Sequence, residues 1–214
     1  MSLASQLHAF KSSMTSQVPP DALAAIEKAA QELAKSDVAD NALKVGADAP
    51  SFELRDAYGN VVRLDDLLKD GPVVLTFYRG QWCPFCNLTL AALQLEFAEI
   101  SRAGATLVAV SPQTQSATLQ TIQTLQTSFP VLSDEGNKVA REFGLSFSLP
   151  DAVRPVYHAL GADLPTSNGD DSYTLPLAAT YIIGRNKKIK YAFVEADYTQ
   201  RMEPADITRA LKAV

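Results

Sequence analysis

The stretch FYRGQWCPFCNLTL (Phe77–Leu90) contains both cysteines of the chain, Cys83 and Cys86. It begins at the end of PVVLTFY (72–78), a continuous apolar and β-branched run that is typical of a strand buried on both faces. The residues after the cysteines, NLTLAALQLEFAEISRAG (87–104), predict a helix. We therefore expect the two cysteines where a central strand runs into the first turn of a helix.

A cysteine at such a junction is expected to be reactive. Backbone N–H groups at a helix N-terminus point outward and the helix dipole favours negative charge there, so a thiol in the first turn has a pKa below its usual value of about 8.5. Pro84 suits the first turn because its missing N–H costs nothing there. Arg79 precedes Cys83 closely enough to add a permanent positive charge to the same site. Together these features predict a nucleophilic thiolate.

The Cys-x-x-Cys spacing favours redox chemistry. Cysteines separated in this way on a helical turn approach closely enough for one to attack and the other to resolve the resulting mixed disulfide or sulfenic acid. A structural zinc site needs about four ligands, and beyond the pair the chain offers only His8 and His158. A structural disulfide across so small a loop would remove little entropy from the unfolded chain. Two buried bystander thiols fit the strand-to-helix position poorly. No metal and no organic cofactor is implied.

Strands and helices alternate along the rest of the chain. We predict a hairpin over 51–64, buried strands over 106–112 and 129–134, and a late hairpin over 178–196. With helices between these strands, the order predicts an α/β fold whose central mixed sheet is mostly parallel and has helices on both faces. The late hairpin adds an antiparallel strand.

Two segments lie outside this alternation. Residues 1–44 are predicted to be helical, with Leu3, Leu7, Phe10 and Met14 on one face of the first helix. The main domain is expected to begin near Val45. Segment 146–176 is expected to form a short helix over 153–160 and then a loop, because its second half is rich in Asn, Gly, Asp and Pro.

The composition is that of one soluble globular domain. The chain has 214 residues, 47% of them hydrophobic, and a net charge of −5. No basic patch indicates nucleic-acid binding, and no apolar run approaches the roughly 18 residues that a membrane span needs. We see no secretory signal. Since two cysteines make no disulfide framework, we expect a reducing compartment, the cytoplasm.

The segments quoted above carry a resemblance. WCPFC resembles the active site of thioredoxin-fold proteins, and VGADAPSFELRDAYGNVVRLDDLL, TLVAVSP, FPVLSDEGNKVAREFGL and AATYIIG are similar to the alkyl hydroperoxide reductase/thiol-specific antioxidant (AhpC/TSA) family, the peroxiredoxins. The resemblance implies a thioredoxin-like domain over 45–214 with a helical extension over 1–44. It also implies a thiol-dependent antioxidant oxidoreductase that reduces hydroperoxides or disulfides and is re-reduced by thioredoxin, glutaredoxin or a small thiol.

The chain departs from the family's usual pattern, a Pro-x-x-x-Thr/Ser-x-x-Cys loop with a remote arginine. If Cys86 takes the place of the last cysteine in the loop, Cys83 fills the Thr/Ser position and Arg79 the proline position. Alignment of the late strand puts Ala178 where the arginine often stands. Pro176, two residues earlier, is a candidate for the cis-proline found in thioredoxins.

These observations leave the nucleophile open. The helix geometry favours Cys83, which is nearer the exposed end of the helix and is our preferred choice, whereas the family loop favours Cys86. Trp82 and Phe85 are expected to form exposed apolar walls of a docking surface around Pro84.

Residues from other segments are given ordinary structural roles by default. For His158 and Tyr157, in segment 146–176, the alternative is a position overhanging the site, but we expect a satisfied surface or core histidine at His158. The default for Glu195, Asp197, Tyr198 and Arg201 is a charged strand end or a helix cap, and the alternative is that one of them lines the pocket.

Two other functions remain as alternatives. One is a thioredoxin-like disulfide reductase without peroxidase activity. The other is a non-catalytic redox-sensing module whose N-terminal helices mediate formation of a homodimer.

Overall fold

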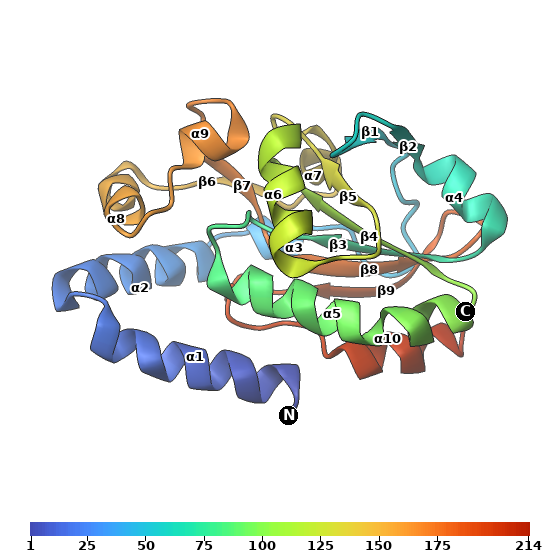
Figure 1. Cartoon of the computed structure of the whole chain (residues 1–214), viewed down its shortest axis with the longest axis horizontal. Helices are drawn as coiled ribbons and strands as arrows, with labels where there is room; N and C mark the ends of the chain where they lie inside the picture. Colours follow the sequence, from blue (N-terminus) through green and yellow to red (C-terminus); the bar gives the residue numbers. More distant parts are fainter.

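A seven-stranded mixed sheet forms the centre of the computed structural model, which describes all 214 residues (Figure 1). The strand order is β2-β1-β5-β4-β3-β8-β9. The strands are β1 (Glu53–Asp56), β2 (Val61–Arg63), β3 (Val73–Phe77), β4 (Thr106–Ser111), β5 (Val131–Ser133), β8 (Ala179–Ile183) and β9 (Ile189–Val194).

The mixed sheet and the two hairpins confirm the prediction, but the expectation of a mostly parallel sheet is wrong. Only the central pairs β3–β4 and β4–β5 are parallel. The pairs β1–β2, β1–β5, β3–β8 and β8–β9 are antiparallel. The reason is that both hairpins join the sheet through an antiparallel strand, which leaves parallel pairing to the three strands between them.

Helices cover both faces of this sheet. On one face lie α1 (Leu3–Gln17), α5 (Pro84–Arg102) and α10 (Pro204–Leu211), with α6 (Gln115–Leu125) beside α5; α5 and α10 run below the sheet in Figure 1. On the other face lie α4 (Leu64–Asp70) and α7 (Lys138–Glu142). None of these helices combines the length and the apolar character that crossing a membrane requires.

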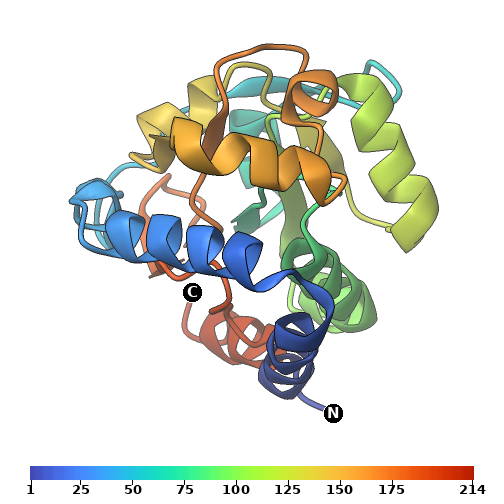
Figure 2. The same cartoon turned by 90° about the vertical axis from the view of Figure 1, so that its left-hand side faces the viewer.

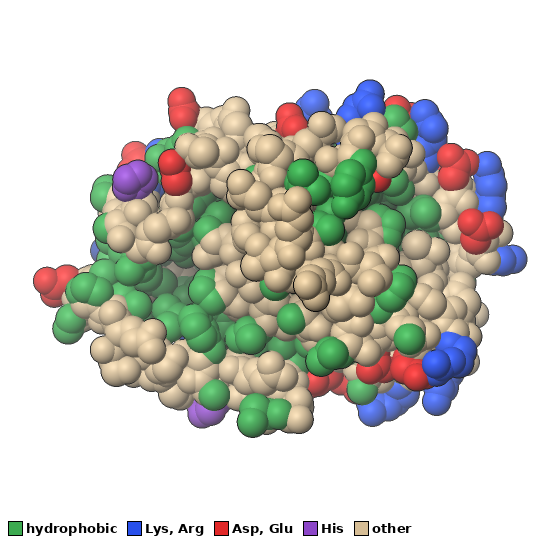
Figure 3. All heavy atoms as spheres, viewed as in Figure 1, with side chains coloured by type: hydrophobic (Ala, Val, Ile, Leu, Met, Phe, Trp, Pro, Cys, Tyr) green, Lys and Arg blue, Asp and Glu red, His purple; other side chains and the backbone are tan.

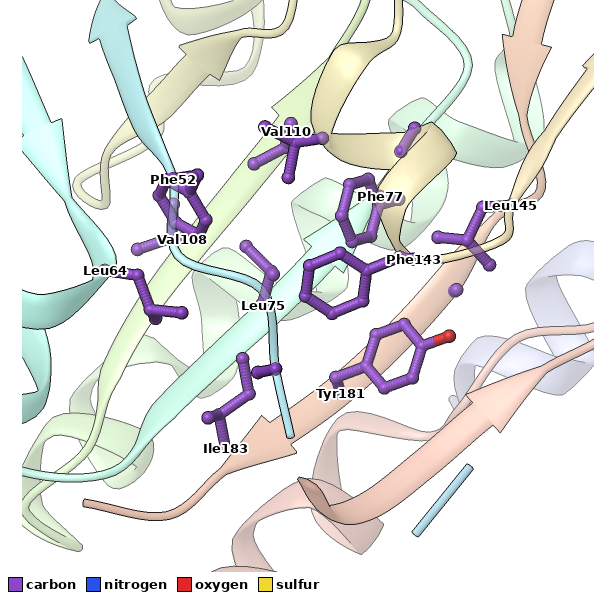
Figure 4. Packing of buried hydrophobic residues seen from close by; sticks show 14 of the residues in the cluster. Phe52, Leu64, Leu75, Phe77, Val108, Val110, Phe143, Leu145, Tyr181 and Ile183 are labelled. Atoms are coloured by element: carbon purple, nitrogen blue, oxygen red, sulfur yellow. The ribbon is translucent and has the colours of Figure 1, made fainter. Parts of the chain in front are cut away.

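Strand β3 connects the two hydrophobic layers because its side chains alternate between the faces. Leu75 and Phe77 point into the cluster under α4 and α7, where the ring of Phe77 lies 5.2 Å from that of Phe143 (Figure 4). Val74 and Tyr78 point into the cluster under α5. The strand that leads to the cysteines is therefore fixed from both sides.

The N-terminal helices pack against the body of the protein. Leu3 and Leu7 of α1 are buried in the cluster under α5 and α10, as the predicted apolar face required. The carboxylate of Glu203 accepts the backbone N–H groups of Leu3 (3.1 Å) and Ala4 (2.7 Å), which favours the start of the helix electrostatically. The next helices are α2 (Pro20–Ala34) and the short α3 (Val38–Asn41).

Segment 146–176 contains more regular structure than its sequence predicts. The helix expected over 153–160 is present as a 3-10 turn, η1 (Asp151–Val153), followed by α8 (Arg154–Ala159). The expected loop is wrong, since it contains α9 (Leu164–Asn168) and the strand β7 (Thr174–Pro176), which pairs with β6 (Ser146–Ser148). Figure 2 shows α2 alongside this segment, and Ile26 of α2 is buried against it.

A glycine shapes the turn between β3 and the cysteines. Gly80 has φ +148°, and a Cβ there would lie 2.4 Å from Nε1 of Trp82. We predict that Gly80→Ala lowers the free energy of unfolding by about 1–3 kcal/mol from backbone strain alone, and by more through the clash. Gly59→Ala is the control, because Gly59 also has positive φ but open space around it. Urea unfolding of both variants tests this, and an equal loss in the two would contradict the role of Trp82.

Candidate active site

The two cysteines lie at the start of α5, as the sequence predicts. Cys83 is the N-cap residue and Cys86 lies in the first turn. Both are free thiols, 3% and 0% exposed, and their Sγ atoms are 2.9 Å apart. That distance allows the two sulfurs to share one proton. The side chain of Cys83 makes no capping hydrogen bond with the helix, so the expected exposed and helix-stabilised position of Cys83 is not observed.

Arg201 is the cation in contact with the pair. Its Nη2 lies 3.7 Å from Sγ of Cys86. Its Nη1 donates to the backbone carbonyls of Tyr198 and Gln200, and no carboxylate pairs with it. The guanidinium is thus held in place by neutral groups, and its charge is left for the sulfur. Sequence reasoning missed this role, because Arg201 reads as an ordinary residue of a charged strand end and nothing in its spacing links it to the cysteines.

Position 178, where the sequence alignment placed the family arginine, lies beside Cys86 and Arg201. Ala178, Cys86 and Arg201 all line a small void of about 10 Å³, close to the size that holds one water molecule. The short side chain of Ala178 leaves this space free. Arg201, from the loop after β9, brings a guanidinium into the region that the family arginine was expected to occupy.

The surroundings shift the pKa values of the two thiols in opposite directions. Burial raises the pKa of both, and for Cys83 the hydrogen bond to Cys86 and the negative charge of Cys86 raise it further. For Cys86 the largest effect after burial is the hydrogen bond with Cys83, followed by the charge of Arg201. These two effects lower the pKa of Cys86 below its ordinary value. The charge and backbone N–H of Arg79 act in the same direction. The thiolate is therefore favoured at Cys86.

Arg79 lies in a cage of aromatic rings. It is 4% exposed, and its guanidinium carbon lies 4.7 Å from the ring centre of Tyr198, 5.0 Å from that of Trp82 and 5.6 Å from that of Tyr157. Its Nη2 donates to the hydroxyl of Tyr157 at 2.8 Å. Cation–π contacts of this kind stabilise a desolvated guanidinium. The structure thus brings Arg79 near the dithiol, as expected, but without any carboxylate partner.

The other predicted residues lie in different surroundings. Pro84 is exposed and Trp82 is half-buried. The expectation of an exposed Phe85 is wrong: it is 2% exposed, because the rings of Phe10 and Tyr198 cover it at 5.2 and 5.4 Å. His158 is on the surface.

Pro176 does not provide the cis bond that was considered for it. It lies in β7, paired with Ser146, and the backbone has no cis peptide bond. A cis-proline beside the cysteines is therefore not part of this site.

Comparison with known proteins decides the family. The sequence model of the AhpC/TSA family matches residues 45–192. The chain belongs to the AhpC/TSA family. It is 30% identical over 148 residues to the chloroplastic peroxiredoxin Q of Oryza sativa subsp. japonica, covering 69% of this chain and 58% of the rice protein. It is 29% identical to the chloroplastic peroxiredoxin Q of Triticum aestivum over 133 residues, 62% of this chain and 61% of that one. The chain thus spans less than two thirds of these relatives.

Solved structures agree with this AhpC/TSA membership at the level of the fold. The peroxidoxin BcpB of Mycobacterium tuberculosis superposes with a TM-score of 0.63 at 23% identity, covering 80% of this chain and 98% of that one. The AhpC of the same organism gives 0.61 at 18% identity, covering 80% and 93%. The predicted thioredoxin-like fold is confirmed.

The contact between Arg201 and Cys86 makes a prediction about acidity. In a Cys83→Ser background, Arg201→Met is expected to raise the pKa of Cys86 by about 1–3 pH units, because an opposite charge next to the thiolate is removed. Because the pKa is lowered in the native site, the ultraviolet absorbance of the Cys86 thiolate should persist below the ordinary thiol pKa and be lost as the pH falls through the lowered value. Arg201→Met moves that loss to higher pH.

The control for this measurement is Arg209→Met in the same background. Arg209 is an exposed arginine of α10 that pairs with Asp206. Its removal should leave the pH profile of the thiolate absorbance unchanged. An unchanged profile for Arg201→Met would contradict the assignment.

Proposed function

We propose that this AhpC/TSA chain is a thiol peroxidase that reduces hydroperoxides through a dithiol–disulfide cycle of Cys83 and Cys86. The observation that supports it is the buried sulfur pair, 2.9 Å apart, with Arg201 in contact with one sulfur. Arg79 adds a second positive charge nearby. Such a site stores one thiolate in surroundings that would otherwise protonate it. The peroxiredoxin names of its relatives support the same reaction class.

In the proposed oxidation, Cys86 is the nucleophile. Its thiolate attacks one peroxide oxygen, the O–O bond breaks, and the other oxygen leaves as water or an alcohol after it gains a proton. Cys86 is then a sulfenic acid. Arg201 contacts the reacting sulfur, so its charge also favours the negative charge that develops on the leaving oxygen.

Cys83 completes the reaction as the resolving thiol. Its sulfur attacks Sγ of Cys86, a Cys83–Cys86 disulfide forms, and the sulfenic oxygen leaves as water with the remaining proton. The peroxide gains two electrons and the dithiol loses two. Reduction by an external thiol returns the protein to its starting state.

Size and access favour peroxide over a protein disulfide as oxidant. Cys86 is fully buried beside a void of about 10 Å³, which suits an oxidant near the size of water. A protein disulfide would need an exposed sulfur, and neither cysteine offers one. Reduction of the disulfide between turnovers requires a reducing compartment, and we propose the cytoplasm because the chain carries only two cysteines.

We predict a clear division between the two cysteine variants. With dithiothreitol as reductant, Cys86→Ser should reduce hydrogen peroxide no faster than the uncatalysed reaction, because it lacks the nucleophile. Cys83→Ser should still form one sulfenic acid per chain, which mass spectrometry of the intact protein detects as one added oxygen. If Cys86→Ser forms the sulfenic acid instead, the nucleophile is Cys83. If wild type and both variants match the uncatalysed rate, the chain is not a peroxidase.

A further inference from the structure

The dithiol has a second, apolar side that the oxidation of Cys86 does not use. Cys83 lines a cavity of about 340 Å³ whose 14 lining residues include 11 hydrophobic ones. This volume lies at the lower end of the range of about 300–1,000 Å³ typical of small-molecule sites. In Figure 3, hydrophobic side chains gather on the left of the view, over α1, α2 and α8 of Figure 1. The cavity can therefore take a small apolar molecule next to a reacting sulfur.

The N-terminal helices provide one wall of this cavity. Phe10 and Met14 come from α1, and Ile26 comes from α2. All three precede residue 45, where the match to the family sequence model begins. The apolar site is thus made in part by a segment of the chain that the family sequence model does not describe.

One charge lies in this apolar lining. Arg79 is the only charged residue among those that line the cavity, and its Nε is a buried donor without an acceptor. An unpaired buried donor is costly, and more so on a charged group. A carboxylate bound in the cavity would supply both the missing acceptor and a counter-charge, because guanidinium and carboxylate form strong charge-assisted hydrogen bonds.

The two cysteines line different spaces in the structure. Cys83 lines the apolar cavity, whereas Cys86 lines the small void with Arg201. In thiol–disulfide exchange, a thiol of lower pKa is the better leaving group. A thiolate in the cavity would attack Cys83, and the sulfur that leaves is Cys86, which Arg201 stabilises. The accessible sulfur and the better leaving group therefore favour the same reaction.

We propose that this cavity binds the reductant, a small apolar dithiol that carries a carboxylate, with the carboxylate on Arg79 and a thiolate directed at Sγ of Cys83. This rests on the proposed function and names the class of its electron donor. The reductant's first sulfur bonds to Cys83, the Cys83–Cys86 bond breaks, and Cys86 leaves as the thiolate beside Arg201. The reductant's second thiolate then attacks its own first sulfur and closes a ring disulfide. Cys83 is released and takes a proton, and two electrons pass to the protein.

A comparison of dihydrolipoate with its neutral amide, dihydrolipoamide, tests whether the carboxylate of the reductant is recognised, because both present the same dithiol on the same apolar chain. The protein is oxidised with diamide, so the test does not depend on peroxidase activity. Reduction is then followed in a stopped-flow instrument through the fluorescence of Trp82, the only tryptophan of the chain and a lining residue of the cavity. We expect dihydrolipoate to reduce the wild type about tenfold faster than the amide, an effect of about 1.4 kcal/mol.

Variants test whether the preference for dihydrolipoate over its amide depends on Arg79. Arg79→Met should bring the ratio of the two rates to about one. Arg154→Met is the matched control and should keep the wild-type ratio, because Arg154 also stacks on a tyrosine, Tyr173 at 4.4 Å, but lies outside the cavity. If Arg79→Met does not fold, Leu160→Glu replaces it. Leu160 lines the cavity and is 45% exposed, so a carboxylate there is tolerated by the fold and should lower the ratio by repulsion.

Three results would overturn this inference. The first is an equal rate of reduction by the two dithiols with the wild type, and the second is a ratio of rates that keeps its wild-type value in the folded cavity variants. The third would show that the cavity binds the oxidant: a carboxylate-bearing alkyl hydroperoxide oxidises the reduced protein far faster than hydrogen peroxide in an Arg79-dependent way, while dihydrolipoate shows no advantage over its amide. A protein that shows the dithiol preference but no peroxide turnover would refute the proposed peroxidase and leave the reductant site standing.

Discussion

The contact between the Arg201 guanidinium and Sγ of Cys86 is the interaction on which the chemistry of this protein depends. A thiolate without exposed surface is expensive, because burial removes the water that would solvate its charge. The second sulfur, 2.9 Å away, provides a proton to share, and the guanidinium provides the opposite charge. Together with the charge and backbone N–H of Arg79, these two groups lower the pKa of Cys86 against the effect of burial. Arg201 thus helps to stabilise a thiolate at a buried position.

The rest of the structure can be understood as the support of this contact. Strand β3 fixes the approach to the cysteines from both faces of the sheet. The loop after β9 places Arg201, and within it Asp197 accepts the backbone N–H of Thr199 at 2.9 Å and its hydroxyl at 2.7 Å. Arg79, caged by aromatic rings, adds a second positive charge without a carboxylate to cancel it. The site therefore combines segments from the beginning, middle and end of the chain.

The sequence was informative where the signal is local. The strand before the cysteines, the helix after them, both hairpins and the position of the Cys-x-x-Cys pair at the junction between that strand and that helix depend on periodicity and spacing over a few residues. Arg201 was not predicted as part of the site because its partner is distant in sequence and its neighbours resemble any charged strand end. Phe85 was expected to be exposed because nothing in the motif indicates that Phe10 of α1 covers it. Helix α9 was missed because its start depends on one side chain, Asp163, which caps the N–H of Thr166 in an otherwise loop-like stretch.

The capping of α1 by Glu203 connects the two ends of the chain next to the reactive sulfurs. Glu203 lies two residues after Arg201, and its carboxylate binds the first turn of α1, while Lys11 of the same helix donates to Thr199 at 3.3 Å. The first helix thus makes hydrogen bonds to the loop both before and after Arg201. Substitutions in an N-terminal segment with no reacting group of its own can in this way change the acidity of a thiol in the family domain without any change in the cysteine motif.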